Sequence, residues 1–233
     1  MKNILFIVNK KADFTIQNYI DKHLPDFEIQ VEENLPKDIL SYDLIVLWSY
    51  RKILKNVSQY RNIILFHSSD LPDGKGWAPI FNTLNRNKKV FVISGIFPAD
   101  EVDSGDIICQ AKFEIKDNHT AEHIRQFDEE ISIMMIKLIC EKFEKNTIFG
   151  KRQNGVESFF DRRKPEDNEI NPKLSILENF NFLRACEKAH PAFFFFNQTK
   201  YFISITPEKN PSFPVSNKKE RLLCVCICFF NNE

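Results

Sequence analysis

The chain has 233 residues, enough for one medium domain with an appendage and for a sizeable core. Its 32 lysines and arginines balance 32 acidic residues, and this formal charge of zero gives no overall field that would attract nucleic acid. No run reaches the roughly 18 apolar residues that span a bilayer, and the N-terminal apolar stretch is too short for a signal peptide. We therefore expect a cytoplasmic protein with no membrane partner.

The first part of the chain alternates apolar strands with amphipathic helices. We expect strands at 2–8, 27–31 and 43–48 and a helix at 13–24. The run at 43–48 is continuous, which is typical of a buried parallel strand. No G-x-G-x-x-G turn follows the first strand, so nothing indicates a dinucleotide cofactor. The alternation predicts a short Rossmann-like α/β domain over residues 1–150.

Residues 62–79 join a short buried strand to an irregular loop, with a histidine at the junction. Four apolar residues at 63–66 precede His67, and proline and glycine residues follow it before helical spacing returns at residue 78. Loops at the carboxyl ends of strands in open α/β sheets are where ligands bind. His67 is therefore a catalytic candidate, because imidazole titrates near neutral pH. Its position alone is equally consistent with a half-buried ring that hydrogen-bonds its own loop.

A second turn carries several carboxylates. Residues 97–107 read Phe-Pro-Ala-Asp-Glu-Val-Asp-Ser-Gly-Asp-Ile and separate apolar runs at 90–96 and 107–115. If the strand that ends at His67 and the strand at 90–96 are neighbours, Asp103 and His67 lie at the same edge of the sheet.

The two patterns together resemble the folate-dependent formyltransferases. His-x-Ser-x-x-Pro-x-x-Lys-Gly occupies 67–76, and Asp-x-Gly-Asp-Ile occupies 103–107. This family includes the methionyl-tRNA, glycinamide-ribonucleotide and sugar N-formyltransferases. The resemblance implies transfer of a formyl group from N10-formyltetrahydrofolate to a primary amine. It implies that His67 transfers a proton or contacts the developing oxyanion and that Asp103 orients its ring. We add Ser69 to this catalytic set.

One position departs from the family pattern. The family usually carries an asparagine two residues before the histidine, where this chain has Leu65. Asn62 lies too far along the strand to replace it. Leu65 offers no donor to the developing oxyanion, so either Ser68, Ser69 or backbone N–H groups do this, or the chemistry is impaired. In the second case the protein is a catalytically silent homologue that binds a ligand without turnover.

The resemblance also implies residues that bind the folate and the acceptor. Those expected at the folate are Tyr50, Lys52, Ile53, Leu54, Asp100 and Val102. Those expected at the acceptor are Lys75, Trp77, Arg162 and Arg163. Composition alone explains residues 49–54 equally well as a strand-to-helix turn with surface cations. It also explains Arg162 and Arg163 as part of a charged linker.

Histidines and cysteines occur in arrangements that we do not expect to hold a metal ion. His119 and His123 have helical i,i+4 spacing, but no third ligand accompanies them, and we expect an exposed pair at a helix start. Cys224, Cys226 and Cys228 alternate without a partner pair. We expect them to be thiols packed in the core.

The rest of the chain reads as a long helix, a linker and a small C-terminal part. We expect the helix at 120–145, the linker at 151–171 and a small α+β domain at 172–233. This domain would contain a hairpin turning near Asn197 and a last strand at 222–230.

We favour a nucleotide-linked amino sugar as the acceptor, because of the zero net charge, the short C-terminal part and the arginine pair. Methionyl-tRNA is the alternative within the family, and a homodimer is a further expectation about partners. An unrelated sugar-binding module is a third hypothesis, which a large separation of His67 and Asp103 would support.

Overall fold

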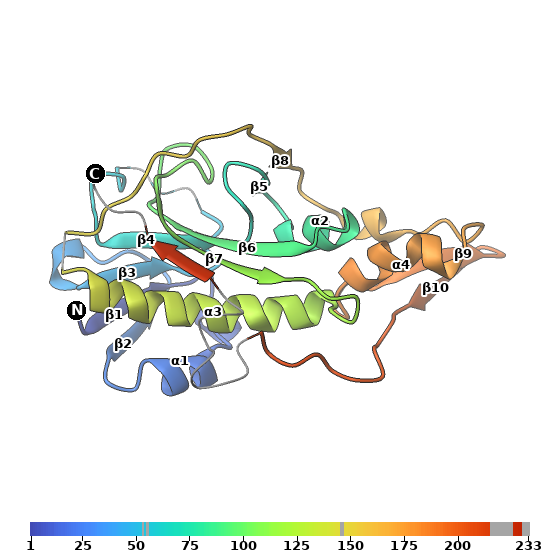
Figure 1. Cartoon of the computed structure of the whole chain (residues 1–233), viewed down its shortest axis with the longest axis horizontal. Coiled ribbons are helices and arrows are strands. Elements are labelled where there is room, and N and C mark those ends of the chain that lie inside the picture. Colours follow the sequence, from blue (N-terminus) through green and yellow to red (C-terminus); the bar gives the residue numbers. More distant parts are fainter. Residues whose placement is uncertain (53, 55, 145–146, 215–225, 230–233) are drawn as a thin grey trace.

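The computed structural model describes residues 1–52, 54, 56–144, 147–214 and 226–229 (Figure 1). Its strands are β1 (Asn3–Ile7), β2 (Glu28–Glu32), β3 (Leu44–Leu47), β4 (Ile63–His67), β5 (Lys75–Gly76), β6 (Val90–Ile96), β7 (Ile107–Glu114), β8 (Phe159–Phe160), β9 (Ala192–Phe196), β10 (Thr199–Ile203) and β11 (Cys226–Phe229). Its helices are α1 (Gln17–His23), α2 (Pro79–Asn85), α3 (Ala121–Lys142) and α4 (Ile176–Ala185), with short 3-10 helices η1 (Lys11–Asp13), η2 (Ile39–Ser41) and η3 (Pro165–Asn168). Within this described part, no helix combines the length and the apolar composition that crossing a bilayer requires.

The central sheet has seven strands in the order β11-β7-β6-β4-β3-β1-β2. Strands β2, β1, β3 and β4 are parallel, as the apolar runs of the first part of the chain predicted. Strands β6, β7 and β11 then alternate in direction. Because β4 and β6 are antiparallel neighbours, the connection from β6 to β7 starts beside Leu65, which pairs with Ile96. This connection carries the acidic turn close to the end of β4.

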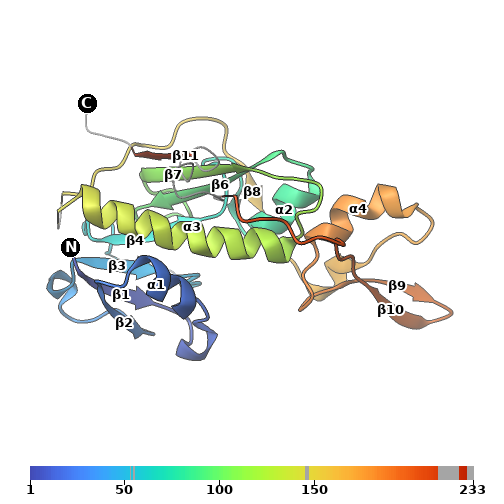
Figure 2. The ribbon, with the colours of Figure 1, turned by 60° about the horizontal axis from the view of Figure 1, so that its bottom comes forward.

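Side chains that alternate along the parallel strands pack on opposite faces of the sheet. Ile4 and Phe6 of β1 belong to the larger core, together with the apolar stripes of α1 and α3. Leu5 and Ile7 belong to a smaller core, formed with the connections before and after β3. Figure 2 shows α1 and α3 side by side along the face of the larger core. Full burial of such an aliphatic side chain stabilises the fold by about 1.5–3 kcal/mol relative to exposure.

The start of α3 corrects the expectation of an exposed histidine pair. The backbone N–H of Thr120 donates to Nδ1 of His123 at 3.2 Å, so His123 satisfies a group that the helix itself leaves unbonded. His119 is buried, and burial, with a smaller contribution from the positive charge of His123, lowers its pKa to about 4. Both rings are therefore part of the helix start and its packing.

The C-terminal part projects from one end of the central sheet (Figure 1). Its hairpin turns at Asn197 and Gln198, which both have positive φ, as a two-residue connection between β9 and β10 requires. Helix α4 packs against α2. The buried guanidinium of Arg184 donates to the carbonyl oxygen of Lys116 at 3.2 Å and to Oδ1 of Asn87 at 3.3 Å. These bonds fix α4 to the connections that flank β6 and β7.

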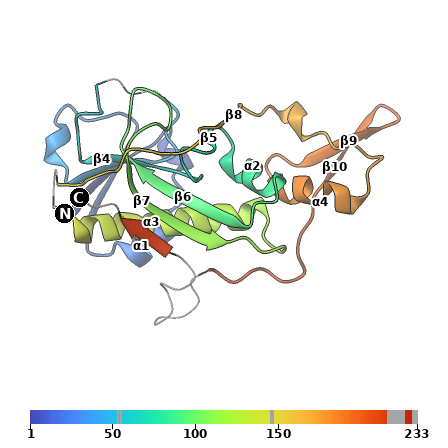
Figure 3. The same cartoon turned by 45° about the horizontal axis from the view of Figure 1, so that its top comes forward.

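The last strand extends the central sheet instead of the C-terminal hairpin. Strand β11 pairs antiparallel with β7 (Figure 3), so residues 226–229 join the central sheet and not the C-terminal part in which we expected the last strand; residues 222–225 and 230 lie outside the described residues. Its alternating apolar pattern gave no information about which edge it would join. Cys228 is exposed, so the expected core thiol is wrong there. Cys224 and the side chain of Cys226 lie outside the described residues. The domain boundaries at 150 and 172 stay predictions.

Candidate functional site

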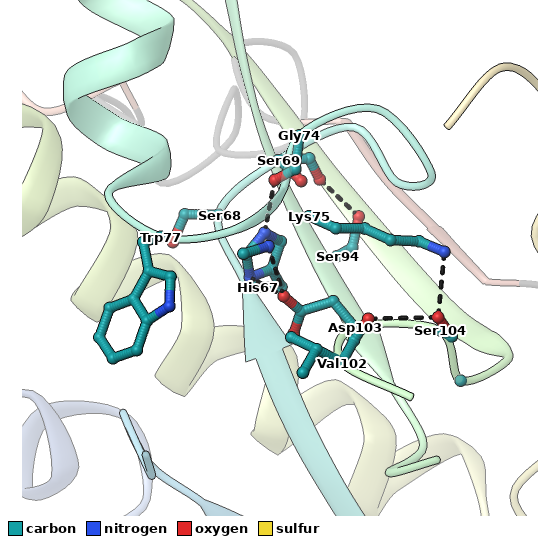
Figure 4. Close-up of polar contacts among 12 residues, drawn as sticks. His67, Ser68, Ser69, Gly74, Lys75, Trp77, Ser94, Val102, Asp103 and Ser104 are labelled. Atoms are coloured by element: carbon teal, nitrogen blue, oxygen red, sulfur yellow. Dashed lines mark hydrogen bonds and ion pairs between the residues drawn. The ribbon is translucent and has the colours of Figure 1, made fainter. Parts of the chain in front are cut away.

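The candidate site lies at the end of β4, where the connection from β6 to β7 folds back over the sheet. His67 ends β4 and is 8% exposed. Its Nε2 lies 2.8 Å from the carbonyl oxygen of Gly74, and its Nδ1 lies 3.3 Å from Oδ2 of Asp103 (Figure 4). A carbonyl oxygen can only accept a hydrogen bond, so Nε2 carries a proton. When Nδ1 is protonated as well, the contact with Asp103 becomes an ion pair.

Backbone geometry holds Asp103 in place. Its Oδ2 accepts a hydrogen bond from the N–H of Gly76 at 2.9 Å, and its carbonyl oxygen accepts one from Nε2 of Gln153 at 2.7 Å. Its φ of 52° lies in the left-handed region, which non-glycine residues seldom adopt. A Cβ at Gly105 would lie 1.7 Å from the carbonyl oxygen of Phe97, so only glycine fits there. The Asp-x-Gly pattern therefore reflects the tight turn that presents the carboxylate to the imidazole.

The segment after α3 packs along the loop that follows His67 and forms hydrogen bonds with it. Strand β5 in that loop pairs in parallel with β8. In addition, the N–H of Gly74 donates to Oγ of Ser158 at 2.8 Å. Residues 158–160 fall within the predicted linker, yet they form part of the scaffold of the site.

A cavity of about 660 Å³ opens beside His67 and Asp103. One side consists of the turns after β3 and β6, including Ser49 and residues 97–104. The other side consists of residues 77–81 and three charged residues, which are Arg125, Asp128 and Glu187. Among the described residues, no cluster of His, Cys, Asp or Glu is arranged to hold a metal ion.

The residues expected at the folate gather on the first side of this cavity. Those that line it are Tyr50, Lys52, Leu54, Asp100 and Val102. Ile53 lies outside the described residues. Asn9, which the sequence did not single out, holds the first turn: its Nδ2 donates to the carbonyl oxygen of Ser49 at 2.7 Å, and its Oδ1 accepts from the N–H of Arg51 at 3.0 Å. That these residues bind folate stays a prediction.

The residues expected at the acceptor do not all reach the cavity. Trp77 lines it, and the guanidinium of Arg162 lies 5.0 Å from the centroid of the Trp77 ring. Arg163 lies 3.3 Å from the centroid of the Phe81 ring, and it also donates to Oδ1 of Asn168 at 2.5 Å. The arginine pair therefore supports the wall of the cavity through two aromatic rings.

Lys75 and Ser69 lie outside the cavity, which corrects the roles expected for them. Lys75 is 1% exposed, and its Nζ contacts Oγ of Ser104 at 3.0 Å and Oε1 of Glu157 at 2.9 Å. In Figure 4 it extends to the side of His67 away from Trp77. Ser69 is buried, and its Oγ has no hydrogen-bond partner among the described residues. The loop has no regular period, so spacing alone could not show where these side chains point.

Leu65 lines the cavity and presents only carbon atoms to it. Asn62 is fully buried elsewhere, with its Nδ2 donating to the carbonyl oxygens of Ile39 and Tyr42 at 3.1 Å each. It therefore cannot supply the amide that Leu65 lacks, as expected from its position in the strand.

Sequence reasoning missed the charged residues on the second side of the cavity. Asp128 of α3 accepts a hydrogen bond from Oγ of Ser68 at 2.7 Å through its Oδ2, whereas its buried Oδ1 has no hydrogen-bond partner among the described residues. Burial raises the pKa of Asp128 to about 6, although Ser68 and then Arg125 act in the opposite direction. Arg125 itself is paired with Glu187. One indication of Asp128 was present in the sequence: it lies four residues after Ile124, which places an acidic side chain on the apolar stripe of a helix.

Comparison with known proteins agrees with the geometry. The model of the formyl transferase family matches residues 10–137, which is more than half of the chain. The chain belongs to the formyl transferase family. The resemblance drawn from the two sequence patterns is thereby confirmed.

Relatives found by sequence within the formyl transferase family include methionyl-tRNA formyltransferases. The methionyl-tRNA formyltransferase of Fusobacterium nucleatum is 29% identical over 162 residues, which cover 67% of this chain and 52% of that protein. The chain spans about half the length of the curated relatives that it matches.

Solved structures share the fold of this family member. A methionyl-tRNA formyltransferase from Clostridium thermocellum has a TM-score of 0.73 and 24% identity, covering 91% of this chain and 96% of that chain. An N-formyltransferase from Helicobacter canadensis, in complex with folinic acid and dTDP-3-aminofucose, has a TM-score of 0.57 and 18% identity, covering 86% of each chain. At these identities the likeness shows the fold alone, and it confirms the predicted α/β formyltransferase fold.

Proposed function

We propose that this chain transfers a formyl group from N10-formyltetrahydrofolate to a primary amine. The observation that carries the proposal is the contact between His67 and Asp103 at the edge of a cavity, in a chain of the formyl transferase family. A large separation of these two residues would have supported the hypothesis of an unrelated sugar-binding module, and they lie in contact.

The residues around the cavity fit a reduced folate. Its volume of about 660 Å³ lies within the range of small-molecule sites. Tyr50 and Leu54 offer aromatic and aliphatic surface, and the backbone groups of the two turns offer donors and acceptors. When bound, N10-formyltetrahydrofolate would supply the formyl carbon that the amine attacks; the bond from that carbon to N10 would break, and N10 would take up a proton as tetrahydrofolate leaves. We assign the folate to the side of the two turns, which leaves the side of Trp77 to the acceptor.

The chemistry that we assign to His67 and Asp103 is proton transfer. Nε2 of His67 is bonded to the carbonyl of Gly74, and Nδ1 faces Oδ2 of Asp103, so the pair as a whole takes the proton of the attacking amine and holds it between Nδ1 and Oδ2. The arriving proton turns the contact with Asp103 into an ion pair, which stabilises the imidazolium. The N–H of Gly76 keeps the carboxylate in position throughout.

Leu65 sets a limit on the rate. Loss of one oxyanion donor typically costs ~10²–10³ in rate. Ser69 lies outside the cavity, and the hydroxyl hydrogen of Ser68 is directed at Asp128. Neither serine is therefore placed to donate a hydrogen bond to the oxyanion in place of the missing amide. Because the proton-transfer pair is intact, we propose an active but slow enzyme and not a silent homologue.

We propose a nucleotide-linked amino sugar as the acceptor. The zero net charge favours a small acceptor over a nucleic acid. Trp77 stacked with Arg162 presents an aromatic face beside a guanidinium, a combination suited to a base and a phosphate. The Helicobacter canadensis protein, which has this fold, was crystallised with folinic acid and dTDP-3-aminofucose. The expected homodimer stays a prediction, which sedimentation of the chain would test.

Methionyl-tRNA is the second candidate acceptor. Its support is the name of relatives such as the Fusobacterium nucleatum protein, at 29% identity. This chain covers only 52% of that protein, so the activity of the whole relative does not transfer to it directly.

The test is incubation with N10-formyltetrahydrofolate and a panel of nucleotide-linked amino sugars, with methionyl-tRNA in parallel. We expect at least one acceptor to gain the mass of one formyl group. Matched sugars that carry a hydroxyl in place of the amine serve as controls and should gain nothing. If no acceptor gains a formyl group at high enzyme concentration, the proposed function is wrong.

A further inference from the structure

Ser68 and Asp128 form a polar pair on the acceptor side of the cavity. Ser68 directly follows His67, and Asp128 reaches the same place from α3. Oγ of Ser68 donates to Oδ2 of Asp128 at 2.7 Å, and both residues line the cavity. A group bound to Ser68 is therefore next to the proton-transfer pair.

The part-buried carboxylate of Asp128 lacks a partner for one of its two oxygens. Its Oδ2 has the bond from Ser68, but its Oδ1 is buried and has no hydrogen-bond partner among the described residues. A buried charge with unmet hydrogen-bonding capacity costs free energy until a partner or counter-charge arrives. The nearby cation, Arg125, is already paired with Glu187.

The hydroxyl of Ser68 extends the negative charge of Asp128 into the cavity. Its hydrogen is directed at the carboxylate, so the lone pairs of Oγ remain for donors that enter from the cavity. An ammonium group offers such donors and a positive charge, whereas a hydroxyl offers one donor and no charge. Polar groups that are left unpaired by the wrong ligand are a strong source of specificity.

We propose that Ser68 and Asp128 form the subsite for the amino group of the acceptor, an inference that rests on the proposed function. The amine donates to Oγ of Ser68, and the carboxylate of Asp128 behind it supplies the counter-charge. In this position the nitrogen lies beside His67, which removes its proton for attack. The pair therefore selects an amine over a hydroxyl at the same position of the acceptor.

The test compares the affinities of matched acceptors with and without the amine. Calorimetry in the presence of folinic acid would use dTDP-3-aminofucose against dTDP-fucose, and methionyl-tRNA against the same tRNA carrying the 2-hydroxy acid. The variants are Asp128→Asn and Ser68→Ala, with Glu129→Gln as a matched control, because Glu129 neighbours Asp128 on α3 but does not line the cavity. Unchanged affinity for folinic acid shows that each variant is folded at the site.

We expect the wild-type chain and Glu129→Gln to prefer the amine in at least one pair of acceptors. Asp128→Asn should reduce this preference about 10- to 100-fold, the range expected when a hydrogen bond to a charged group is lost. Ser68→Ala should reduce it in the same direction, and it keeps the proposal testable if Asp128→Asn does not fold.

The outcomes separate this inference from the proposed function. A wild-type preference for the amine that survives both Asp128→Asn and Ser68→Ala overturns the subsite, even if formyl transfer is observed. The absence of any wild-type preference in both pairs overturns it as well. A preference that depends on Asp128, in a chain that forms no formylated product, leaves the subsite standing and overturns the proposed function.

Discussion

Asp103 and Asp128 both line the cavity and differ in how their carboxylates are satisfied. Oδ2 of Asp103 has two polar partners, the N–H of Gly76 at 2.9 Å and Nδ1 of His67 at 3.3 Å. Asp128 has one, the hydroxyl of Ser68, and its second oxygen is buried with no hydrogen bond from any described residue. The first comes from a glycine-containing turn and the second from the apolar face of a helix.

The role of each carboxylate therefore depends on its partners and not on its residue type. Asp103 has a positioned backbone donor and an imidazole, so it suits the task of holding one ring in one orientation. Asp128 is short of partners, and burial raises its pKa to about 6. It is therefore suited to receive a cation from outside the protein.

The largest effect should come from breaking the satisfied pair. Asp103→Asn removes the negative charge that stabilises the imidazolium of His67, and we expect turnover to fall at least ~10²-fold. His67→Asn should cost as much. The double variant should cost little more, because residues that act as one unit are grossly non-additive. Steady-state kinetics with folinic acid binding as the folding control would measure this. Additive losses would show that the two residues act separately.

The next effect concerns stability and pH. The pKa of Asp128 is raised from 3.8 to about 6 in the folded chain, mainly by burial. Between about pH 4 and pH 6 the folded chain therefore holds a proton that the unfolded chain has released, and stability falls as pH rises. Asp128→Asn removes this loss, so relative to wild type it should gain on the order of 3 kcal/mol between pH 4 and pH 7.

Urea unfolding at a series of pH values measures that gain. His119→Gln is an informative control because the pKa of His119 is lowered to about 4, so its contribution to stability is lost as pH falls and has the opposite sign. Parallel stability curves for wild type and Asp128→Asn would contradict the account of Asp128 as an underpartnered carboxylate.

A smaller effect should follow from giving the cavity the amide that Leu65 lacks. Leu65→Asn places a donor two residues before His67, and we expect turnover to rise about tenfold, below the ~10²–10³ of a fully positioned oxyanion donor. Leu65→Val keeps the position apolar and should not raise turnover. Initial rates at saturating substrates would show the difference. A folded Leu65→Asn variant with an unchanged rate would mean that the oxyanion is stabilised elsewhere.

The smallest effect should lie on the folate side. Asn9→Ala removes two hydrogen bonds to the turn at Ser49 and Arg51, and we expect affinity for folinic acid to fall about fivefold. The amine preference of the acceptor side should not change. Asn9→Asp keeps the bond from the N–H of Arg51 but sets a carboxylate oxygen against the carbonyl oxygen of Ser49, so it should bind folinic acid no better than Asn9→Ala in calorimetry. Unchanged folinic acid binding in Asn9→Ala would argue against this turn as part of the folate site.

The sequence indicated the parts of this site that depend on local patterns. His67 ends an apolar run, and Asp103 stands two residues before the glycine that its turn requires. Both could be found because a strand end and a tight turn are short-range features. The parallel strands β1 and β3 were found for the same reason, as continuous apolar runs.

Features that depend on long-range packing were not found. Asp128 was hidden in the stripe of α3, where spacing indicates burial but not what the buried side chain meets. Lys75 was assigned to the acceptor, but pairing of β5 with β8 turns it toward Glu157 and Ser104. The destination of β11 depended on an open edge at β7, more than 100 residues earlier in the chain.

The most direct test of the account is formyl transfer by wild type and by His67→Asn, under conditions in which both bind folinic acid. Mass spectrometry of dTDP-3-aminofucose incubated with N10-formyltetrahydrofolate would follow the product. We expect formylated sugar with wild type and about 1% of that rate or less with His67→Asn. Equal rates in the two proteins, with both folded and both binding the folate, would contradict it.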